Sequence, residues 1–192
     1  MLKKLLFAVT GVVFFLAPAS LDALAQSDTP KVEAGVLFSF IRFRDLDTTG
    51  AGFGGRLTYN VNDSVGIEGE LNYFPSDKQG VFESGKKTQG LFGVKTGLRS
   101  ETAGIFGKIR PGFVRFSRDF DGFEDSKTDF ALDVGGVIEV YPSTASVVRF
   151  DIGDTIIRFG ERTVSDVFGN PVTFNSFTSH NLQVSIGVGV RF

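Results

Sequence analysis

Strict alternation of apolar and polar side chains is the feature of this sequence that most limits its fold. From Leu182 to Phe192 every second residue is apolar, and the residues between them are Gln, Ser, Gly and Arg. A period of two indicates a β-strand with one apolar and one polar face. The same alternation recurs over Val65–Phe74 and Asp129–Tyr141. Repeated amphipathic strands predict an all-β protein.

Less regular versions of the pattern cover most of the remaining chain. Five more strands are expected at Val32–Phe43, Gly52–Asn60, Thr88–Arg99, Gly104–Ser117 and Ser146–Phe159. With Asn181–Phe192 as the last strand, the sequence predicts an eight-stranded antiparallel up-and-down barrel. Most of these strands are longer than the roughly 5 to 6 residues usual in globular proteins and long enough to cross a bilayer, which takes about 9 to 11. The high content of Gly (24) and Phe (22) also disfavours a helical bundle.

The connections between the expected strands alternate in length. Tight turns are expected at Val61–Ser64, Ser100–Ala103 and Pro142–Ala145. Long polar connections are expected at Arg44–Ala51, Pro75–Lys87, Arg118–Thr128 and Gly160–Ser179. Short periplasmic turns and long outer loops are typical of outer-membrane barrels. An even number of strands then places both ends of the barrel domain in the periplasm.

The N-terminus has the features of an export signal. Two lysines precede an apolar run over Leu5–Leu16, and Ala23-Leu24-Ala25 has the small-x-small pattern of a signal-peptidase site. The run is too short for a membrane-spanning helix, which needs about 20 residues. We therefore expect residues 1–25 to be a signal peptide and residues 26–192 to form the outer-membrane β-barrel domain.

The overall charge and the absence of cysteine exclude several classes of function. Lys and Arg number 20 and Asp and Glu number 22, so the chain lacks the basic excess that neutralises nucleic-acid phosphates. The absence of Cys removes disulfides, thiolate nucleophiles and Cys-ligated zinc. We therefore expect no nucleic-acid partner.

Alternation alone fits both a membrane barrel with an apolar exterior and a secreted, lipocalin-like barrel with an apolar cavity. The polar face favours the membrane barrel, because it carries Gly, Ser and isolated charges rather than many Lys and Glu residues. The candidate interior charges nearly balance: Arg56, Lys95, Lys108, Arg110, Arg149 and Arg191 against Glu68, Glu70, Asp133, Glu139 and Asp151. We expect Arg56 to face Glu68 and Arg149 to face Glu139 across turns, and the whole set to fill the narrow interior as a structural plug.

Two residues break the alternation. Asp154 falls on the apolar face, and Pro111 interrupts a strand of a barrel that has no edge. Bulges at Gly153-Asp154 and Pro111-Gly112 would resolve both, turning Asp154 inward and Val114 outward.

Aromatic residues near the strand ends are candidates for the two girdles of a membrane barrel. They are Tyr59 and Tyr141 at the periplasmic end and Tyr73, Phe74, Phe40 and Phe53 at the outer end. Ordinary strand aromatics are the alternative interpretation. In the last long loop, Phe168, Phe174 and Phe177 fit either an adhesive tip or residues folded onto the barrel mouth.

The chain resembles the small eight-stranded outer-membrane β-barrel family, which includes the OmpA transmembrane domain and OmpX. The resemblance covers about Lys31 to Phe192 and depends on the architecture and on the terminal Gly187–Phe192 segment. It implies a monomer in the bacterial outer membrane with outer-membrane lipids and lipopolysaccharide around it. It also implies that the outer-membrane assembly machinery reads Phe192, Val190 and Val188. No enzyme motif comes with it.

Three weak site signals remain, and none leads to a predicted catalytic, cofactor-binding or metal site. Gly50–Gly55 matches G-x-G-x-x-G, but an alternating strand follows where a phosphate-binding helix would be needed. The acidic residues Asp119, Asp121, Glu124 and Asp125 lack the EF-hand spacing and suggest a solvated loop rather than a Ca²⁺ or Mg²⁺ site. His180 has Ser176 and Ser179 nearby, but Leu182 stands where outer-membrane lipid A hydrolases have Ser.

Three functional hypotheses follow. The favoured one is a non-enzymatic outer-membrane barrel with a role in envelope structure or in surface interactions through its outer loops. A narrow pore or a carrier for small molecules is the first alternative. A lipid-modifying outer-membrane enzyme that uses His180 is the second.

Overall fold

The structure is a computed structural model that describes residues 29–44, 48–75, 77–79, 82–120, 123–165 and 171–192. The expected signal peptide, residues 1–25, lies outside the described residues. No helix in the described part of the chain is long and apolar enough to cross a membrane.

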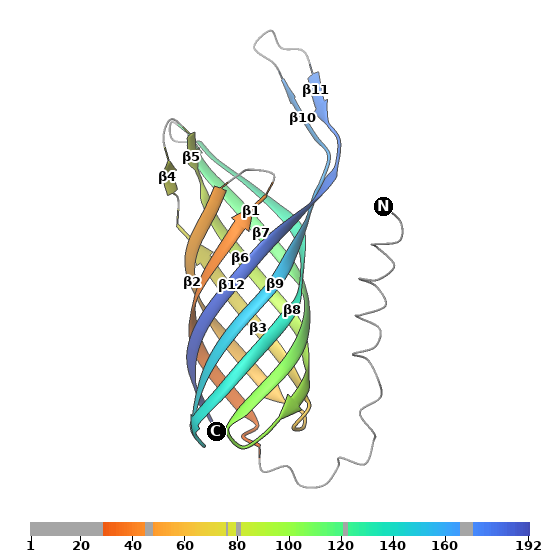
Figure 1. The fold of residues 1–192 in the computed structure, drawn as a ribbon. Helices are drawn as coiled ribbons and strands as arrows, with labels where there is room; N and C mark the ends of the chain where they lie inside the picture. The colour runs from red at the N-terminus through yellow and green to blue at the C-terminus, as the bar shows by residue number, and fades with distance from the viewer. Residues whose placement is uncertain (1–28, 45–47, 76, 80–81, 121–122, 166–170) are drawn as a thin grey trace.

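Within the described residues, eight strands close into an antiparallel barrel (Figure 1). They are β1 (Val32–Phe43), β2 (Thr48–Asn60), β3 (Val65–Phe74), β6 (Lys86–Arg99), β7 (Ala103–Phe120), β8 (Phe123–Ser143), β9 (Ser146–Phe159) and β12 (Phe177–Arg191). Strands adjacent in this sequence order pair with each other, and β1 closes the barrel against β12. The predicted fold class is therefore confirmed, and β1, β3 and β9 have the bounds expected from the alternation.

The two ends of the barrel differ in their connections. At one end, which we call the turn end, short turns join β2 to β3, β6 to β7 and β8 to β9, and Val32 and Phe192 exchange backbone hydrogen bonds of 2.8 and 2.9 Å. At the opposite end, the loop end, long connections join β3 to β6 and β9 to β12. The connections expected at Arg44–Ala51 and Arg118–Thr128 are shorter than predicted, because β2 begins at Thr48 and β7 and β8 extend to Phe120 and Phe123. Both ends of the barrel-forming chain lie at the turn end, as the even strand number predicts.

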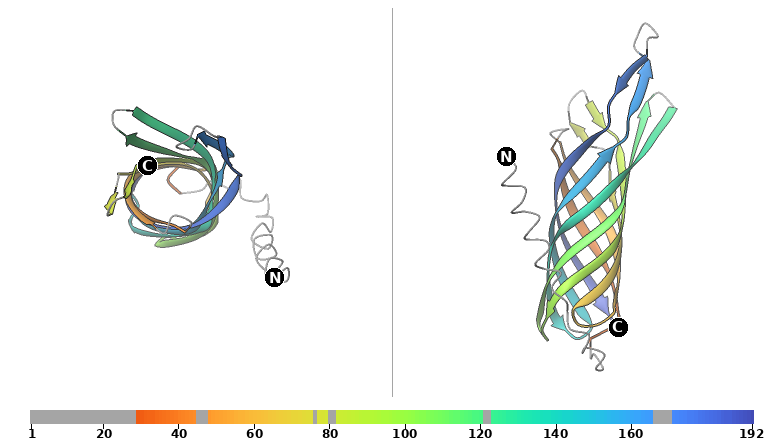
Figure 2. Two further views of the ribbon diagram at one scale, coloured as in Figure 1. Left: turned by 90° about the horizontal axis from the view of Figure 1, so that it is seen from above. Right: turned by 90° about the vertical axis from the view of Figure 1, so that its right-hand side faces the viewer.

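The long connections contain more strand structure than the sequence suggested. Two small hairpins form beyond the barrel, β4 (Asp77–Gln79) with β5 (Phe82–Ser84) and β10 (Arg162–Ser165) with β11 (Pro171–Phe174). Strands β7 and β8 stay paired up to Phe120 and Phe123, well past the expected strand end at Ser117. The hairpins therefore project from the loop end, and the β10–β11 pair rises well above the rim (Figure 2).

The alternation divides the residues between lumen and exterior as predicted. Buried polar and charged side chains line the lumen, and exposed large apolar side chains cover the outside. Representative exterior residues are Val36, Leu57, Leu71, Phe92, Leu98 and Ile152, all more than half exposed. This exterior suits contact with lipid.

Both predicted bulges are wrong. The β9–β12 register is constant through Asp154. The β6–β7 register is the same on either side of Arg110 and Pro111, where β6–β7 pairing is interrupted. Proline lacks an N–H, so the ladder loses a pairing there without a shift of register. Val114 therefore stays inward and buried at 2% exposure, and Asp154 stays on the outer face.

Candidate functional site

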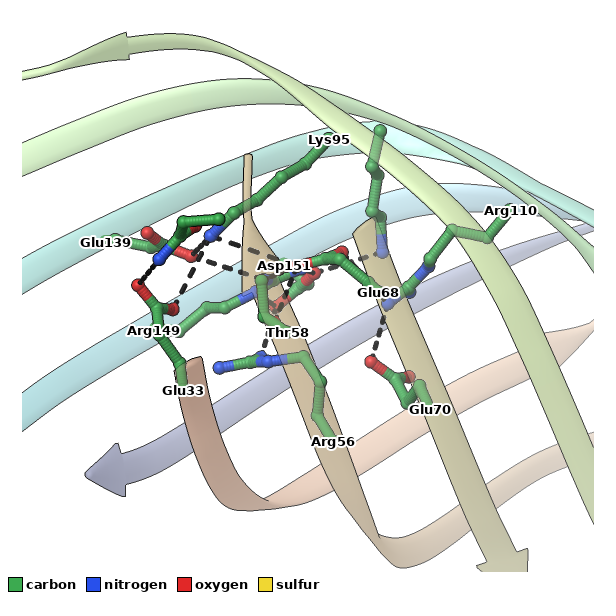
Figure 3. Close-up of polar contacts among 12 residues, drawn as sticks. Glu33, Arg56, Thr58, Glu68, Glu70, Lys95, Arg110, Glu139, Arg149 and Asp151 are labelled. Carbon is green, nitrogen blue, oxygen red and sulfur yellow. Dashed lines mark hydrogen bonds and ion pairs between the residues drawn. The ribbon is translucent and has the colours of Figure 1, made fainter. Parts of the chain in front are cut away.

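The lumen contains a connected network of ion pairs in the half nearer the turn end (Figure 3). Arg149 of β9 is its centre and forms a two-point ion pair with Glu68 of β3. Its Nε and Nη2 atoms each donate to Asp151 at 2.8 Å, and Nη1 lies 3.2 Å from Glu139 Oε1. Strands β3 and β9 stand on opposite sides of the barrel, so the Arg149–Glu68 pair crosses the lumen.

Arg110 of β7 forms a second junction. It donates from Nε and Nη2 to Asp133 Oδ2 at 2.9 and 2.7 Å, and from Nη1 to Glu70 Oε2 at 2.7 Å. Lys108, two residues earlier on the same strand, places Nζ 3.0 Å from Asp133 and 3.1 Å from Asp151. Asp133 is thereby shared by two cations of β7, and Asp151 is shared by Lys108 of β7 and Arg149 of β9.

Further ion pairs close the lumen toward the turn end. Lys95 Nζ lies 2.5 Å from Glu139 Oε1 and 3.6 Å from Glu33 Oε2. The Tyr141 hydroxyl donates to Glu139 at 2.8 Å, and the Arg191 guanidinium lies over the Tyr141 ring, 3.9 Å from its centroid. The turn end is therefore filled by charged groups that have partners.

Uncharged polar side chains cross the lumen nearer the loop end. Gln89 of β6 donates to Gln183 of β12 at 3.0 Å, and these two strands also lie on opposite sides of the barrel. Asn72 donates to Gln89 at 2.9 Å, and the Thr155 hydroxyl donates to Gln183 at 2.8 Å. This polar layer bridges the lumen from four strands.

An apolar cluster fills the lumen at the loop end. Its buried members are Ile41, Phe43, Phe74, Val114, Ala131 and Ile157, each at most 2% exposed, with Phe116 and Phe159 packed against them. We call this group the loop-end cluster. The sequence predicted a polar interior along the whole barrel, and this part of the prediction is wrong. Because the predicted bulges are absent, the apolar residues near the ends of β7 and β9 keep pointing inward.

The predicted interior charges are confirmed. All eleven point into the lumen, and none is more than 7% exposed. Arg149 stands opposite Glu139 as expected, but Arg56 stands opposite Glu70 rather than Glu68. The register pairs Asn60 with Gly66, so each partner on β3 is shifted by two residues from the expected one, and the ion partner of Arg56 is Asp151, at 3.9 Å.

Sequence reasoning missed two members of the network. Glu33 is 1% exposed, and the Arg99 side chain is 5% exposed and lies 3.4 Å from Glu33. Both residues lie near strand ends, but their position in the alternation indicates that their side chains point into the lumen. Glu33 alternates with outward Ala34 and Val36, and Arg99 shares the parity of Lys95.

The girdle predictions hold only for some residues. Tyr59, Phe40 and Phe53 are 53, 48 and 59% exposed on the outer face, and Tyr73 packs beside Phe53 with ring centroids 5.6 Å apart. Tyr141 and Phe74 point into the lumen at 5 and 1% exposure. Their assignment to the girdles is therefore wrong.

The structure does not turn the glycine motif or the acidic residues into a binding site among the described residues. Gly50–Gly55 lies inside β2, so it is part of a strand wall. The acidic side chains Asp119, Asp121, Glu124 and Asp125 lie outside the described side chains. Among the described residues, no group of three His, Cys, Asp or Glu side chains could hold a metal ion.

His180 and Ser179 point to opposite faces of β12. The Ser179 hydroxyl is buried and donates to Asn181 Oδ1 at 3.1 Å, whereas His180 is exposed and its Nδ1 lies 2.6 Å from Asp154 Oδ2. Ser176 accepts a hydrogen bond from Arg158 at 3.5 Å. The described contacts thus give His180 an acidic partner and give both serines other partners.

Of the loop phenylalanines, only the Phe177 side chain is described. It is 49% exposed and stacks on Phe159, with ring centroids 4.7 Å apart. Phe159 in turn packs against the loop-end cluster. Phe177 therefore extends this aromatic packing to the barrel rim.

Comparisons with known proteins agree with this architecture. A family model described as outer membrane protein beta-barrel domain matches residues 10–192. The solved structure of Ail, the attachment invasion locus protein of Yersinia pestis, is similar with a TM-score of 0.55 at 14% identity, covering 87% of this chain and all (100%) of Ail. Neisserial surface protein A matches with a TM-score of 0.55 at 15% identity, covering 84% of this chain and 96% of that one.

OprG from Pseudomonas aeruginosa matches with a TM-score of 0.53 at 12% identity, covering 87% of this chain and 99% of that one. A search of curated proteins gave no match. At these identities the structural likeness establishes the fold.

Proposed function

The chain belongs to the outer membrane protein β-barrel domain family and is located in the bacterial outer membrane. We propose that it is a non-enzymatic barrel that does not conduct ions. Its wall contributes to the structure of the envelope, and its loop end presents strand extensions to the cell exterior. We also propose that residues 1–25 are removed on export and that the barrel domain works as a monomer.

The filled lumen is the observation that carries this proposal. Ion pairs, amides and apolar side chains follow one another along the axis, and two contacts, Arg149–Glu68 and Gln89–Gln183, join opposite walls. Opening a path would separate buried charges from their partners, which costs about 3–5 kcal/mol for each broken pair. This cost argues against the pore and carrier alternatives.

The loop end supports a role in surface interactions. In outer-membrane barrels the long connections face the exterior. Here β7, β8 and the β10–β11 hairpin carry paired backbone beyond the barrel (Figure 2). Ail has also been solved with the heparin analogue sucrose octasulfate, which is a property of Ail. We propose that the strand extensions of this chain likewise contact molecules at the cell surface.

The enzyme alternative has less support. A serine hydrolase needs a serine hydroxyl within hydrogen-bond reach of the histidine base. His180 contacts Asp154, but Ser179 lies on the other face of the strand and donates to Asn181. His180→Ala should leave the lipid A composition of the outer membrane unchanged, and altered lipid A would support the enzyme instead.

Reconstitution in planar bilayers tests the proposal. Folding is checked on an SDS gel, where the unboiled and the boiled protein migrate differently. The folded protein is expected to give no steady conductance. A triple variant that truncates one residue in each layer, Arg149→Ala with Gln89→Ala and Phe74→Ala, serves as the positive control for a leaky lumen, provided that its gel shift shows a folded barrel. Regular conductance steps from the unchanged protein would contradict the proposal and favour the narrow pore.

A further inference from the structure

The part of β8 that extends beyond the barrel has one open edge. From Phe123 to Asp129 the strand pairs with β7, whereas its pairing with β9 begins only at Phe130, opposite Arg158. The chain of β9 leads instead into the β10–β11 hairpin, which forms a two-stranded sheet of its own. The two extensions lean apart above the rim (Figure 1, Figure 2). Among the described residues, no strand therefore covers this edge of β8.

The pairing with β7 shows which backbone groups of β8 face the open edge. The Tyr141 N–H donates to the carbonyl oxygen of Thr102, directly before β7, at 2.8 Å. Successive residues of an antiparallel strand direct their backbone groups to opposite neighbours, and the β7–β8 register is constant along the strand. The odd-numbered residues of β8 therefore bond to β7. Ser126 and Thr128 direct their N–H and C=O groups to the open edge.

Side chains replace backbone bonds at the point where β9 leaves β8. Continued pairing would set Gly160 opposite Thr128. Instead, the Gly160 N–H donates to Asp129 Oδ1 at 3.2 Å, and the Gly160 carbonyl oxygen accepts from Lys127 Nζ at 3.2 Å. No described backbone group bonds to that of Thr128 on this side. The two neighbours of Thr128 thus satisfy Gly160 and leave the edge of β8 available to another strand.

Asp129 has an acceptor without a donor at the base of this edge. Its side chain is only 4% exposed, and Oδ1 already contacts both Gly160 and Lys127. Oδ2 is buried and has no hydrogen-bond partner. A buried carboxylate oxygen without a donor is unfavourable. A donor supplied by an incoming chain would satisfy it, and a cationic donor would do so best.

The open edge also lacks the features that usually block exposed strand edges. Phe123–Asp129 contains no proline, and its pairing with β7 contains no bulge. A lysine directed outward can also block an edge. Lys127, however, is held by Gly160 and Asp129. The edge is therefore accessible to main-chain hydrogen bonds.

We propose that this edge of β8 binds an extended peptide segment of another protein, and that the segment carries lysine or arginine. The added strand pairs its N–H and C=O groups with those of Ser126 and Thr128, and a basic side chain reaches Asp129 Oδ2. Lipids and glycans lack the regular main-chain donors and acceptors that such an edge matches. The proposal rests on the outward orientation of the loop end in the proposed function and specifies the class of surface partner.

A synthetic peptide tests main-chain recognition directly. The probe is a capped, fluorescent peptide of alternating threonine and lysine, as long as the open edge. Its binding to the folded protein in detergent is measured by fluorescence anisotropy at constant ionic strength, and saturable binding is expected. The same peptide with every backbone nitrogen methylated has no N–H donors and should bind at least about tenfold more weakly.

Thr128→Pro and Thr128→Ala form a matched pair of variants. Proline removes the N–H that faces the open edge and no bond to β7, a position at which strands accept proline. Alanine keeps this N–H and removes only the side chain. Thr128→Pro should weaken peptide binding by at least about tenfold, and Thr128→Ala should leave it unchanged. The heat-sensitive gel shift confirms folding, and Ser126→Pro repeats the test on the same edge if Thr128→Pro does not fold.

Asp129→Asn tests the basic side chain of the partner. Asparagine can still accept the Gly160 N–H through its carbonyl oxygen, but it has no charge. Binding of the threonine–lysine peptide should weaken by about fivefold, whereas binding of a threonine–glutamine peptide should stay unchanged. Equal losses for the two peptides would overturn the assignment of a basic partner.

Three further outcomes would overturn the proposal. They are equal binding of the methylated peptide, equal losses in Thr128→Pro and Thr128→Ala, and a dimer of the protein that Thr128→Pro dissociates. The last outcome would identify a second copy as the occupant of the edge. None of these results changes the expected bilayer conductance, so the proposed function is tested separately.

Discussion

Arg149 of β9 and Glu68 of β3 meet across the barrel and form a two-point ion pair although 81 positions separate them in sequence. Both side chains are fully buried, at 0% exposure. The pair therefore acts as a cross-brace between opposite walls. A brace of this kind fixes the spacing of strands that make no backbone contact with each other.

Loss of the brace should destabilise the barrel strongly. Arg149→Gln leaves Glu68, Asp151 and Glu139 without their shared cation, and removal of one partner from a buried pair costs about 3–5 kcal/mol. The urea midpoint of the detergent-solubilised protein, followed by its gel shift, should fall accordingly. Arg115→Gln, an exposed arginine on the outer face of β7, should change stability by less than about 0.5 kcal/mol. Equal midpoints for the two variants would show that the network is not structural.

Truncation in the loop-end cluster should cost about as much as a core truncation in a soluble protein. Phe74→Ala removes a ring that is 1% exposed inside the barrel, with an expected loss of about 3–5 kcal/mol. Phe53→Ala removes a ring that is 59% exposed on the outer face and should cost clearly less. Urea denaturation of both variants measures the difference. A larger loss for Phe53→Ala would mean that lipid contact outweighs the loop-end cluster.

Two glycines of β2 give a matched pair of substitutions. A Cβ atom at Gly52 would lie 2.5 Å from the Phe74 ring and 2.5 Å from the Tyr73 carbonyl oxygen, so the backbone itself would have to shift. Gly52→Ala should therefore cost about 1–3 kcal/mol. At Gly55 the nearest atom would be 3.8 Å away, and Gly55→Ala should be nearly neutral. Similar folded yields and urea midpoints for both variants would argue against tight packing at Gly52.

Most of the barrel can be predicted from the sequence, because the odd or even position of a residue in a strand decides which face its side chain points to. One face of each strand meets lipid and the other meets the lumen, so a charge such as Lys95 or Asp133 defines the inward parity for its whole strand. The same rule applies to Phe74, which shares the parity of Glu68 and Glu70, and to Tyr141, which shares that of Glu139. Their position along the strand suggests the girdles, but their parity places both side chains in the lumen.

Contacts across the lumen could not be predicted in the same way. Alternation shows that Arg149 points inward, but which carboxylate it meets on the far wall depends on the relative stagger of strands that are not neighbours. The error of two residues in the partner of Arg56 shows that even the pairing of neighbouring strands depends on the register across one turn. The loop-end cluster was missed because bulges were invoked to remove apolar residues from an interior that was assumed to be polar throughout.

Phe192 should matter for assembly more than for stability. The Phe192 side chain is 68% exposed, and only its backbone is tied into the barrel, through two hydrogen bonds with Val32. These bonds persist whatever side chain the residue carries. Phe192→Ala should therefore refold in detergent with a urea midpoint within about 0.5 kcal/mol of the unchanged protein. In cells, the same variant should accumulate less in the outer membrane if the assembly machinery reads this aromatic ring.

Comparison of the two measurements separates recognition from folding. Val190 lies on the same outer face at 55% exposure and belongs to the same expected signal. Val190→Ala should therefore keep its urea midpoint and accumulate in the outer membrane less than the unchanged protein but more than Phe192→Ala. Leu98 lies on the outer face at 74% exposure but outside the terminal segment, and Leu98→Ala should leave assembly unchanged. If Phe192→Ala lowers refolding in detergent and assembly in cells to the same degree, its effect is on stability, and a signal role for the C-terminal aromatic is wrong for this chain.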